Sequence, residues 1–83
     1  MTPNLDECKE VLLRRPDDVE VLHECGVKLA RSGCFPEAVD VFERILMLEP
    51  QHKESYNNLA NIAQERGNLE TAEELYKKAL SID

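Results

Sequence analysis

Five side chains of the types that bind metals or act as nucleophiles are scattered along the chain. They are Cys8, His23, Cys25, Cys34 and His52. His23 and Cys25 are two positions apart, so on a helix they would point to different faces. The chain has an odd number of cysteines and neither a CxxC nor an HExxH motif, which disfavours a zinc site and a disulfide framework. We therefore interpret Cys25 as a small apolar core residue and predict no metal site and no cofactor.

Carboxylates are the other abundant reactive groups, with 17 Asp and Glu against 10 Lys and Arg and a net charge of −7. They fall at solvated positions of the expected helices, and no nucleophile elbow or glycine-rich phosphate loop accompanies them. The sequence therefore predicts a protein that is not an enzyme. The acidic balance disfavours nucleic acid and anionic membrane surfaces as partners, because both attract basic proteins. It favours a protein or peptide partner with basic or polar segments.

Three features bear on where the protein works. Free thiols are typical of a reducing compartment, so a cytoplasmic location is expected. The first residues, Met1 to Glu7, lack the basic start and apolar run of a signal peptide. No stretch approaches the roughly 20 apolar residues that span a bilayer, so no membrane segment is predicted.

These side chains must be positioned by helices, because the chain repeats itself with helical spacing. A shift of about 34 residues aligns positions of similar size or turn chemistry along its length. The aligned pairs are Pro16 with Pro50, Leu22 with Tyr56, Cys25 with Leu59, Gly26 with Ala60, Gly33 with Gly67, Ala38 with Ala72, Phe42 with Tyr76, Leu46 with Leu80, and Leu48 with Ile82. Within each unit the apolar residues recur at i, i+3, i+4 and i+7, which indicates amphipathic helices stacked in pairs.

The positions of capping and turn residues predict where the helices begin and end. Asp17 followed by Glu20 predicts a capping box, and Gly33 and Gly67 are placed to end helices in the left-handed conformation. Pro36 suits the first turn of the next helix. About five helices are therefore expected, at roughly 3–15, 18–32, 36–48, 52–66 and 69–82.

Small residues are expected at the closest approach of each helix pair. The prediction places Gly26 opposite Ala38 in the first pair and Ala60 opposite Ala72 in the second. A glycine inside a helix costs up to about 1 kcal/mol relative to alanine. We therefore expect a packing reason for Gly26.

From Val19 to Asp83, these residues at this spacing resemble the tetratricopeptide repeat (TPR) family. The segment Tyr56-Asn57-Asn58-Leu59-Ala60-Asn61 looks particularly like repeats of the O-GlcNAc transferase type. The first unit departs from the family pattern, with Leu22 where tryptophan is common. The resemblance implies an all-α, TPR-like α-α superhelix of two helix-turn-helix repeats plus an N-terminal helix. A single TPR domain, 1–83, is expected, with a capping helix or partial repeat at 1–16, repeat 1 at 17–50 and repeat 2 at 51–83.

The resemblance also implies that the first helix of each pair lines a concave groove where partners bind. Asparagine presents both a donor and an acceptor, so it can pair with the backbone of an extended peptide. In the transferase-type repeats the asparagine matching Asn58 has that role. The clamp that other TPR proteins use for acidic chaperone tails is not supported, because His23 and Val27 replace its basic and amide residues. The predicted groove contacts are Asn58, Asn61, Asn57, Glu54, Glu24, His23 and Val27.

The last expected helix indicates a second function, which is self-association. A terminal unit of a stacked array needs a polar cap, and this helix carries an apolar stripe with no later helix to cover it. Exposed apolar patches usually mark interfaces, so a homodimer or a stacked array is an alternative. Its contacts would be Leu69, Leu75, Tyr76, Leu80 and Ile82. A third alternative, also open, is that the chain is a fragment of a larger TPR protein or enzyme.

Overall fold

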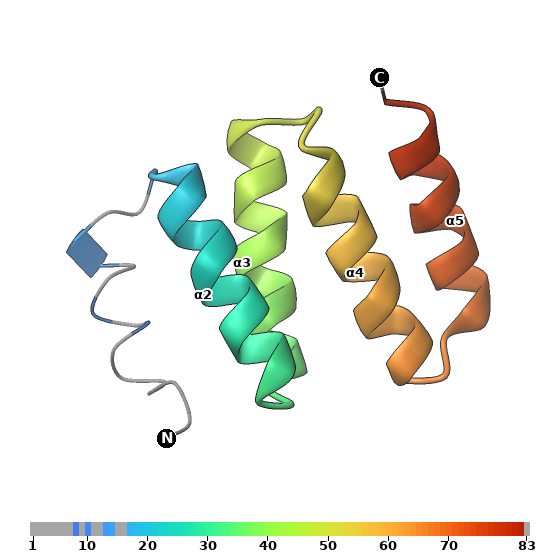
Figure 1. Cartoon of the computed structure of the whole chain (residues 1–83), viewed down its shortest axis with the longest axis horizontal. Coiled ribbons are helices and arrows are strands. Elements are labelled where there is room, and N and C mark those ends of the chain that lie inside the picture. Colours follow the sequence, from blue (N-terminus) through green and yellow to red (C-terminus); the bar gives the residue numbers. More distant parts are fainter. Residues whose placement is uncertain (1–7, 9, 11–12, 15–16, 83) are drawn as a thin grey trace.

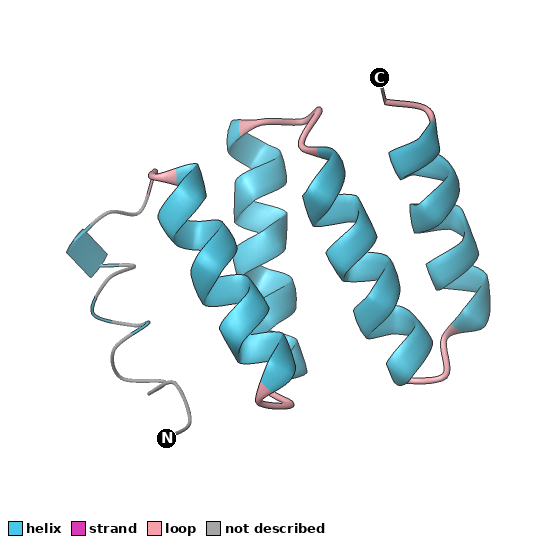
Figure 2. Ribbon diagram, in the orientation of Figure 1, coloured by secondary structure: helices cyan, strands magenta, loops and turns pink. Residues whose placement is uncertain are grey.

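The fold of the chain, seen in a computed structural model, is a row of α-helices (Figure 1 and Figure 2). The structure describes residues 8, 10, 13, 14 and 17–82. Its helices are α2 (Val19–Arg31), α3 (Phe35–Leu48), α4 (Lys53–Glu65) and α5 (Leu69–Leu80), and the described residues contain no strand. The predicted all-α fold is confirmed, with helix boundaries close to those expected.

The expected N-terminal helix, 3–15, lies largely outside the described residues. Cys8, Glu10, Leu13 and Arg14 are described, and all four are helical. Cys8 is buried, whereas Leu13 is 84% exposed.

The four described helices form two antiparallel pairs, α2 with α3 and α4 with α5 (Figure 1). The second pair stands beside the first because α4 packs against α3 and also touches α2. The backbone of α5 approaches only α4 among the described helices. The first helices of the two pairs, α2 and α4, therefore lie side by side, as the family resemblance implied.

The start of α2 differs by one residue from the predicted capping box. Asp18 is the N-cap, and its carboxylate accepts a hydrogen bond from the backbone N–H of Val21 at 3.3 Å. Asp17 instead forms an ion pair with Arg44 of α3, with 3.0 Å between its Oδ1 and the guanidinium Nη2. The carboxylate predicted to cap α2 thus links the two helices of the first pair.

The two helix turns use glycine as predicted. Gly33, between α2 and α3, has φ of +80°, and Gly67, between α4 and α5, has φ of +81°. Residues that carry a Cβ rarely adopt this left-handed backbone conformation. Pro36 lies in the first turn of α3, where its missing N–H removes no helical hydrogen bond.

The core centres on the first pair and its contact with α4. Leu22, Phe42 and Ile45 are fully buried, and Leu59 and Ile62 of α4 join the same cluster. By contrast, the buried residues of α5 are two alanines, Ala72 and Ala79. The largest buried side chains therefore lie in the first pair.

Gly26 has a packing reason, although its nearest neighbour is different from the one expected. A Cβ on this residue would lie 2.7 Å from Cζ of the Phe42 ring and 2.8 Å from its Cε1. Phe42 is one turn after Ala38, the residue predicted to lie opposite Gly26. The missing side chain thus makes room for an aromatic ring rather than for close contact between backbones.

None of the described helices is long and apolar enough to cross a membrane.

Candidate functional site

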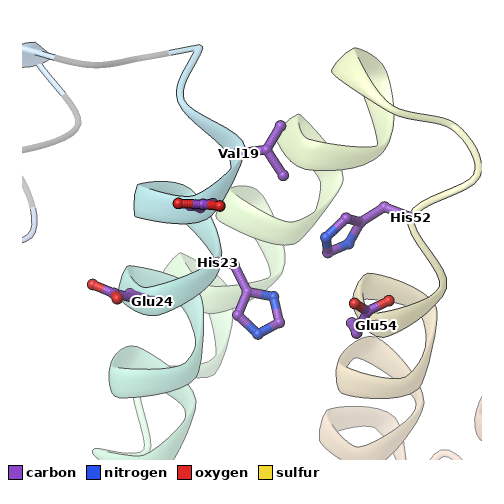
Figure 3. Close-up of a pocket in the computed structure, with 6 residues that line it drawn as sticks. Val19, His23, Glu24, His52 and Glu54 are labelled. Atoms are coloured by element: carbon purple, nitrogen blue, oxygen red, sulfur yellow. The ribbon is translucent and has the colours of Figure 1, made fainter.

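A cavity of about 300 Å³ opens between the first turns of α2 and the beginning of α4 (Figure 3). Both imidazole rings in Figure 3 point into the space between these two segments. We call this cavity the histidine pocket. Its lining residues are Val19, Glu20, His23, Glu24, His52 and Glu54.

The sequence of α2 explains why four of its residues line the pocket. Val19 and His23 are one helical turn apart, and so are Glu20 and Glu24, so these side chains lie on one side of the helix. Leu22, Cys25 and Leu29 form the adjoining stripe of the helix, which is buried in the core. Burial of the apolar stripe therefore directs the polar side of α2 towards α4.

His52 is held in the pocket because it caps α4. Its Nδ1 accepts a hydrogen bond from the backbone N–H of Ser55 at 3.2 Å and lies 2.7 Å from the hydroxyl of Ser55. Accepting through Nδ1 leaves Nε2 as the nitrogen that carries hydrogen in the neutral ring. Because Ser55 is fully buried, this pair fixes the orientation of the imidazole.

His23 is held by packing rather than by hydrogen bonds. Its ring meets Phe42 edge to face at 6.2 Å between centroids, and it meets His52 at 5.6 Å with an interplanar angle of 62°. Its Nδ1 is buried and has no hydrogen-bond partner among the described residues. Such unsatisfied buried polar atoms are uncommon in native proteins.

The pocket carries negative charge. Glu20, Glu24 and Glu54 are exposed at its rim, and none of them forms an ion pair with another described residue. Within residues 17–82 and the four described positions before them, no cluster of three or more His, Cys, Asp or Glu is arranged to hold a metal ion. The lining therefore offers carboxylate acceptors, beside two imidazole rings, to a cationic organic group.

The predicted groove contacts are divided between this pocket and the rest of the α2–α4 face. His23, Glu24 and Glu54 line the pocket. Asn57 and Asn58 are half-buried on α4 and lie outside the lining. Two further predicted contacts remain, Val27 and Asn61.

Val27 is half-buried and packs against the hydrophobic core. Asn61 is exposed, and its side-chain oxygen accepts a hydrogen bond from the hydroxyl of Tyr76 on α5. The same hydroxyl lies 3.1 Å from Oε1 of Gln64. Asn61 thus already has a partner within the second pair.

The predicted groove contacts omitted three residues of the pocket, Val19, Glu20 and His52. The repeat held a signal for His52, because the same shift that aligns the two units pairs it with Asp18, the N-cap of α2. Histidine is not among the preferred N-cap residues, so its side chain did not indicate a cap. Val19 had no signal beyond its place one turn before His23.

The residues predicted for self-association lie on α5 and just after it. Leu69 is 66% exposed and Leu80 is 79% exposed. Leu75, Tyr76 and Ile82 are half-buried, and Leu75 packs against the core. A second cavity of about 260 Å³ lies between α3, α4 and α5, with Val39, Leu59, Ile62 and Leu75 among its lining residues.

Two of the three cysteines are buried, at Cys8 and Cys25, and Cys34 is half-buried. Burial raises the pKa of the Cys25 thiol from 9.0 to about 12, and a hydrogen bond with Cys8 contributes to this increase. The reactive form of cysteine is the thiolate. Cys25 therefore stays protonated near neutral pH, as a core residue would.

Comparison with known proteins gives one family match and several similar structures. Residues 54–83 match the family described as tetratricopeptide repeat. The chain is 30% identical over 73 residues to the probable biofilm formation methyltransferase WspC of Pseudomonas putida. The aligned residues cover 88% of this chain and 17% of that protein. The chain thus spans a small part of this relative.

Solved structures of MamA share the fold over most of the chain. A point mutant of MamA has a TM-score of 0.86 at 30% identity, over 92% of this chain and 56% of that chain. MamA MSR-1 has a TM-score of 0.84 at 30% identity, over 89% of this chain and 42% of that chain. This chain spans about half the length of these structures. The predicted resemblance to the tetratricopeptide repeat family is confirmed, while the likeness to the O-GlcNAc transferase type stays a prediction: residues 54–83 match a tetratricopeptide repeat, and the chain has the fold of a tetratricopeptide-repeat protein.

Proposed function

We propose that this chain is a non-catalytic module that binds a peptide or helix of a partner protein on the face formed by α2 and α4. The repeat family and the fold support a protein-interaction module. One observation favours this particular face. Three predicted contact residues, His23, Glu24 and Glu54, converge on one cavity between the first helices of the two pairs.

The asparagines of α4 extend the proposed face beyond the cavity. Asn57 and Asn58 are half-buried, and their amide groups hydrogen-bond to no other described side chain. Each amide offers two donors and an acceptor, which matches the backbone of an extended peptide. A peptide lying along α4 would thus contact the pocket and these amides together.

The charge of the chain restricts the class of partner. A net charge of −7 disfavours nucleic acid and anionic membranes, which bind basic surfaces. A protein segment with basic or polar residues is favoured for the same reason. A reducing cytoplasmic compartment would suit the free thiols.

Replacing Asn57 and Asn58 together with alanine tests this function. Peptides selected from a random displayed library on the wild-type chain should bind the variant about tenfold or more weakly, because hydrogen bonds to the peptide backbone are lost. Asn61 is left intact because it contacts Tyr76. Fluorescence anisotropy with the selected peptides measures the dissociation constants.

The matched control is Glu74→Ala, an exposed position on α5 away from the proposed face. It should leave peptide affinity unchanged, and circular dichroism should show the same helix content for both variants. Equal affinity of the Asn57/Asn58 variant and the wild type for every selected peptide would overturn the proposed face.

A second proposed function is self-association through α5. The observation that favours it is the exposure of Leu80 and Leu69 on a helix whose backbone meets only α4 among the described helices. Burial of apolar surface drives most protein association, at about 25 cal/mol per Å². A second copy of the chain is the proposed occupant.

Sedimentation velocity over a range of concentrations tests this alternative. Because Leu80 is largely exposed, Leu80→Glu should dissociate an assembly without disturbing the core. Leu75 is unsuitable for this purpose because it packs against the core. A wild-type chain that remains monomeric at high micromolar concentration would exclude self-association of functional strength.

A further inference from the structure

The charge around the histidine pocket selects a cation. Glu20, Glu24 and Glu54 bring three formal negative charges to its lining, and no Lys or Arg lines it. The N-termini of α2 and α4 oppose a cation, but each is equivalent to only about half a positive charge. The carboxylates outweigh this effect. An anionic ligand is therefore disfavoured.

The size of the pocket suits one side chain. Its volume of about 300 Å³ is at the lower end of the roughly 300–1,000 Å³ that ligand pockets usually have. The lining includes one apolar residue, Val19, which offers a surface for an alkyl stem. A cationic end on an apolar stem describes the long basic side chains of a protein partner.

The two rings favour a planar cation. His52 is fixed by its bonds to Ser55, whereas no hydrogen bond to another described residue fixes the ring of His23, whose Nδ1 is unpartnered. A ligand that packs against the His23 ring therefore breaks no hydrogen bond of that ring. A guanidinium is flat, stacks on aromatic faces and donates from five N–H groups, whereas an ammonium is a compact, strongly hydrated charge.

We propose that the histidine pocket binds an arginine side chain of the partner peptide. The guanidinium donates hydrogen bonds to the carboxylate of Glu54 and packs against the rings of His23 and His52, while Glu20 and Glu24 add negative charge to the lining. Val19 contacts the alkyl stem. This inference rests on the proposed peptide-binding function and adds the residue type that the peptide must supply.

A pair of short synthetic peptides tests the inference directly on the full chain. One has a central arginine between glycines with blocked ends, and the other has citrulline, which is neutral and nearly the same shape, in its place. Titration is followed by NMR through the side-chain signals of His23 and His52. The arginine peptide should shift both signals and bind about tenfold or more tightly than the citrulline peptide.

Matched variants separate local from general charge effects. Glu24→Gln with Glu54→Gln should remove the preference for arginine. Glu37→Gln with Glu74→Gln makes the same change in net charge at exposed positions of α3 and α5, and should preserve the preference. His52→Asn keeps an N-cap residue on α4 but removes one ring, and should weaken arginine binding without loss of helix content.

Three results would overturn the inference. They are equal binding of the two peptides, no shift of either histidine at millimolar arginine peptide, and equal weakening by both pairs of glutamate variants. Its failure is distinguishable from failure of the proposed function. Library-selected peptides that depend on Asn57 and Asn58 but bind equally with citrulline would exclude the arginine site and leave the peptide-binding face intact.

Discussion

At the scale of single residues, Gly26 is the position that packing restricts most sharply. A methyl group there would lie 2.7 Å from the ring of Phe42, which is fully buried and cannot move into solvent. The sequence predicted a restricted glycine, because Ala60 occupies the equivalent place. It did not predict the neighbour, because helical spacing fixes which residues face inward but not which of two adjacent turns makes contact.

Gly26→Ala should therefore destabilise the fold. Overpacking a core costs about 1–3 kcal/mol, which exceeds or offsets the gain of up to about 1 kcal/mol in helix propensity. Urea unfolding measures the change. The double variant Gly26→Ala/Phe42→Leu should lose less free energy of unfolding than the sum of the losses of the two single variants. If the two losses simply add, the contact with Phe42 does not explain why Gly26→Ala is destabilising.

Cys25 gives a residue-scale prediction for pH. Burial and a hydrogen bond with Cys8 raise its folded-state pKa to about 12, against 9.0 for an ordinary thiol. The folded state thus favours the protonated thiol. Its contribution to stability is complete below about pH 9 and is lost as pH rises towards about 12, because the unfolded thiol ionises first.

Urea unfolding between neutral and alkaline pH tests this in the wild type and in Cys25→Ala. The variant should lose less stability above pH 9 than the wild type, because it lacks the titrating group. Cys34→Ala, which leaves Cys25 and Cys8 in place, should follow the wild type. Parallel curves for all three proteins would contradict the prediction.

At the scale of elements, the two pairs begin with the same bond made by different side chains. Asp18 caps α2 through the N–H of Val21, and His52 caps α4 through the N–H of Ser55. The sequence predicted the starts of both helices to within one residue, at 18 and 52. It named Asp17 as the cap of α2, one residue too early, because Asp17 and Asp18 are both good cap residues, and it named no cap for α4, because histidine is a poor one.

As the N-cap, His52 should stabilise α4 more than histidine usually stabilises a helix at this position. His52→Ala should lower stability by about 1 kcal/mol, the usual cost of losing an N-cap, whereas His52→Asn should retain most of it. Thermal unfolding monitored at 222 nm compares the variants. Equal midpoints for the alanine variant and the wild type would mean that the bond to Ser55 contributes nothing to stability.

At the scale of the whole molecule, the core is uneven. Leu22, Phe42 and Ile45 are fully buried in the first pair, whereas α5 buries Ala72 and Ala79. In sequence, the first unit departs from the family pattern at Leu22, yet this unit holds the largest fully buried side chains. Fit to a pattern measures residue types, whereas stability depends on how many neighbours cover each side chain.

Hydrogen exchange should reveal this asymmetry. Backbone amides of α3, which packs against both α2 and α4, should exchange slowest, and those of α5 should exchange fastest among the four helices. Native-state exchange followed by NMR measures the opening free energy of each amide. Equal protection of α3 and α5 would show that the described residues unfold as one cooperative unit.

Much of the fold was predictable, because helix periodicity, two turn glycines and the repeat all indicate the same arrangement. Less of the candidate site was predictable. His23, Glu24 and Glu54 were expected on one face, but their convergence depends on how closely α4 packs beside α2. That distance follows from the core side chains, which a single-helix pattern does not describe.

The two turn glycines have a stereochemical consequence. Gly33 and Gly67 are exposed and share φ of about +80°, a conformation that is unfavourable for L-residues but natural for their mirror images. A chemically synthesised chain with D-alanine at either position would keep the native backbone and lose less conformational freedom on folding. At the turns of the two hairpins, the backbone thus already has the conformation that D-residues favour.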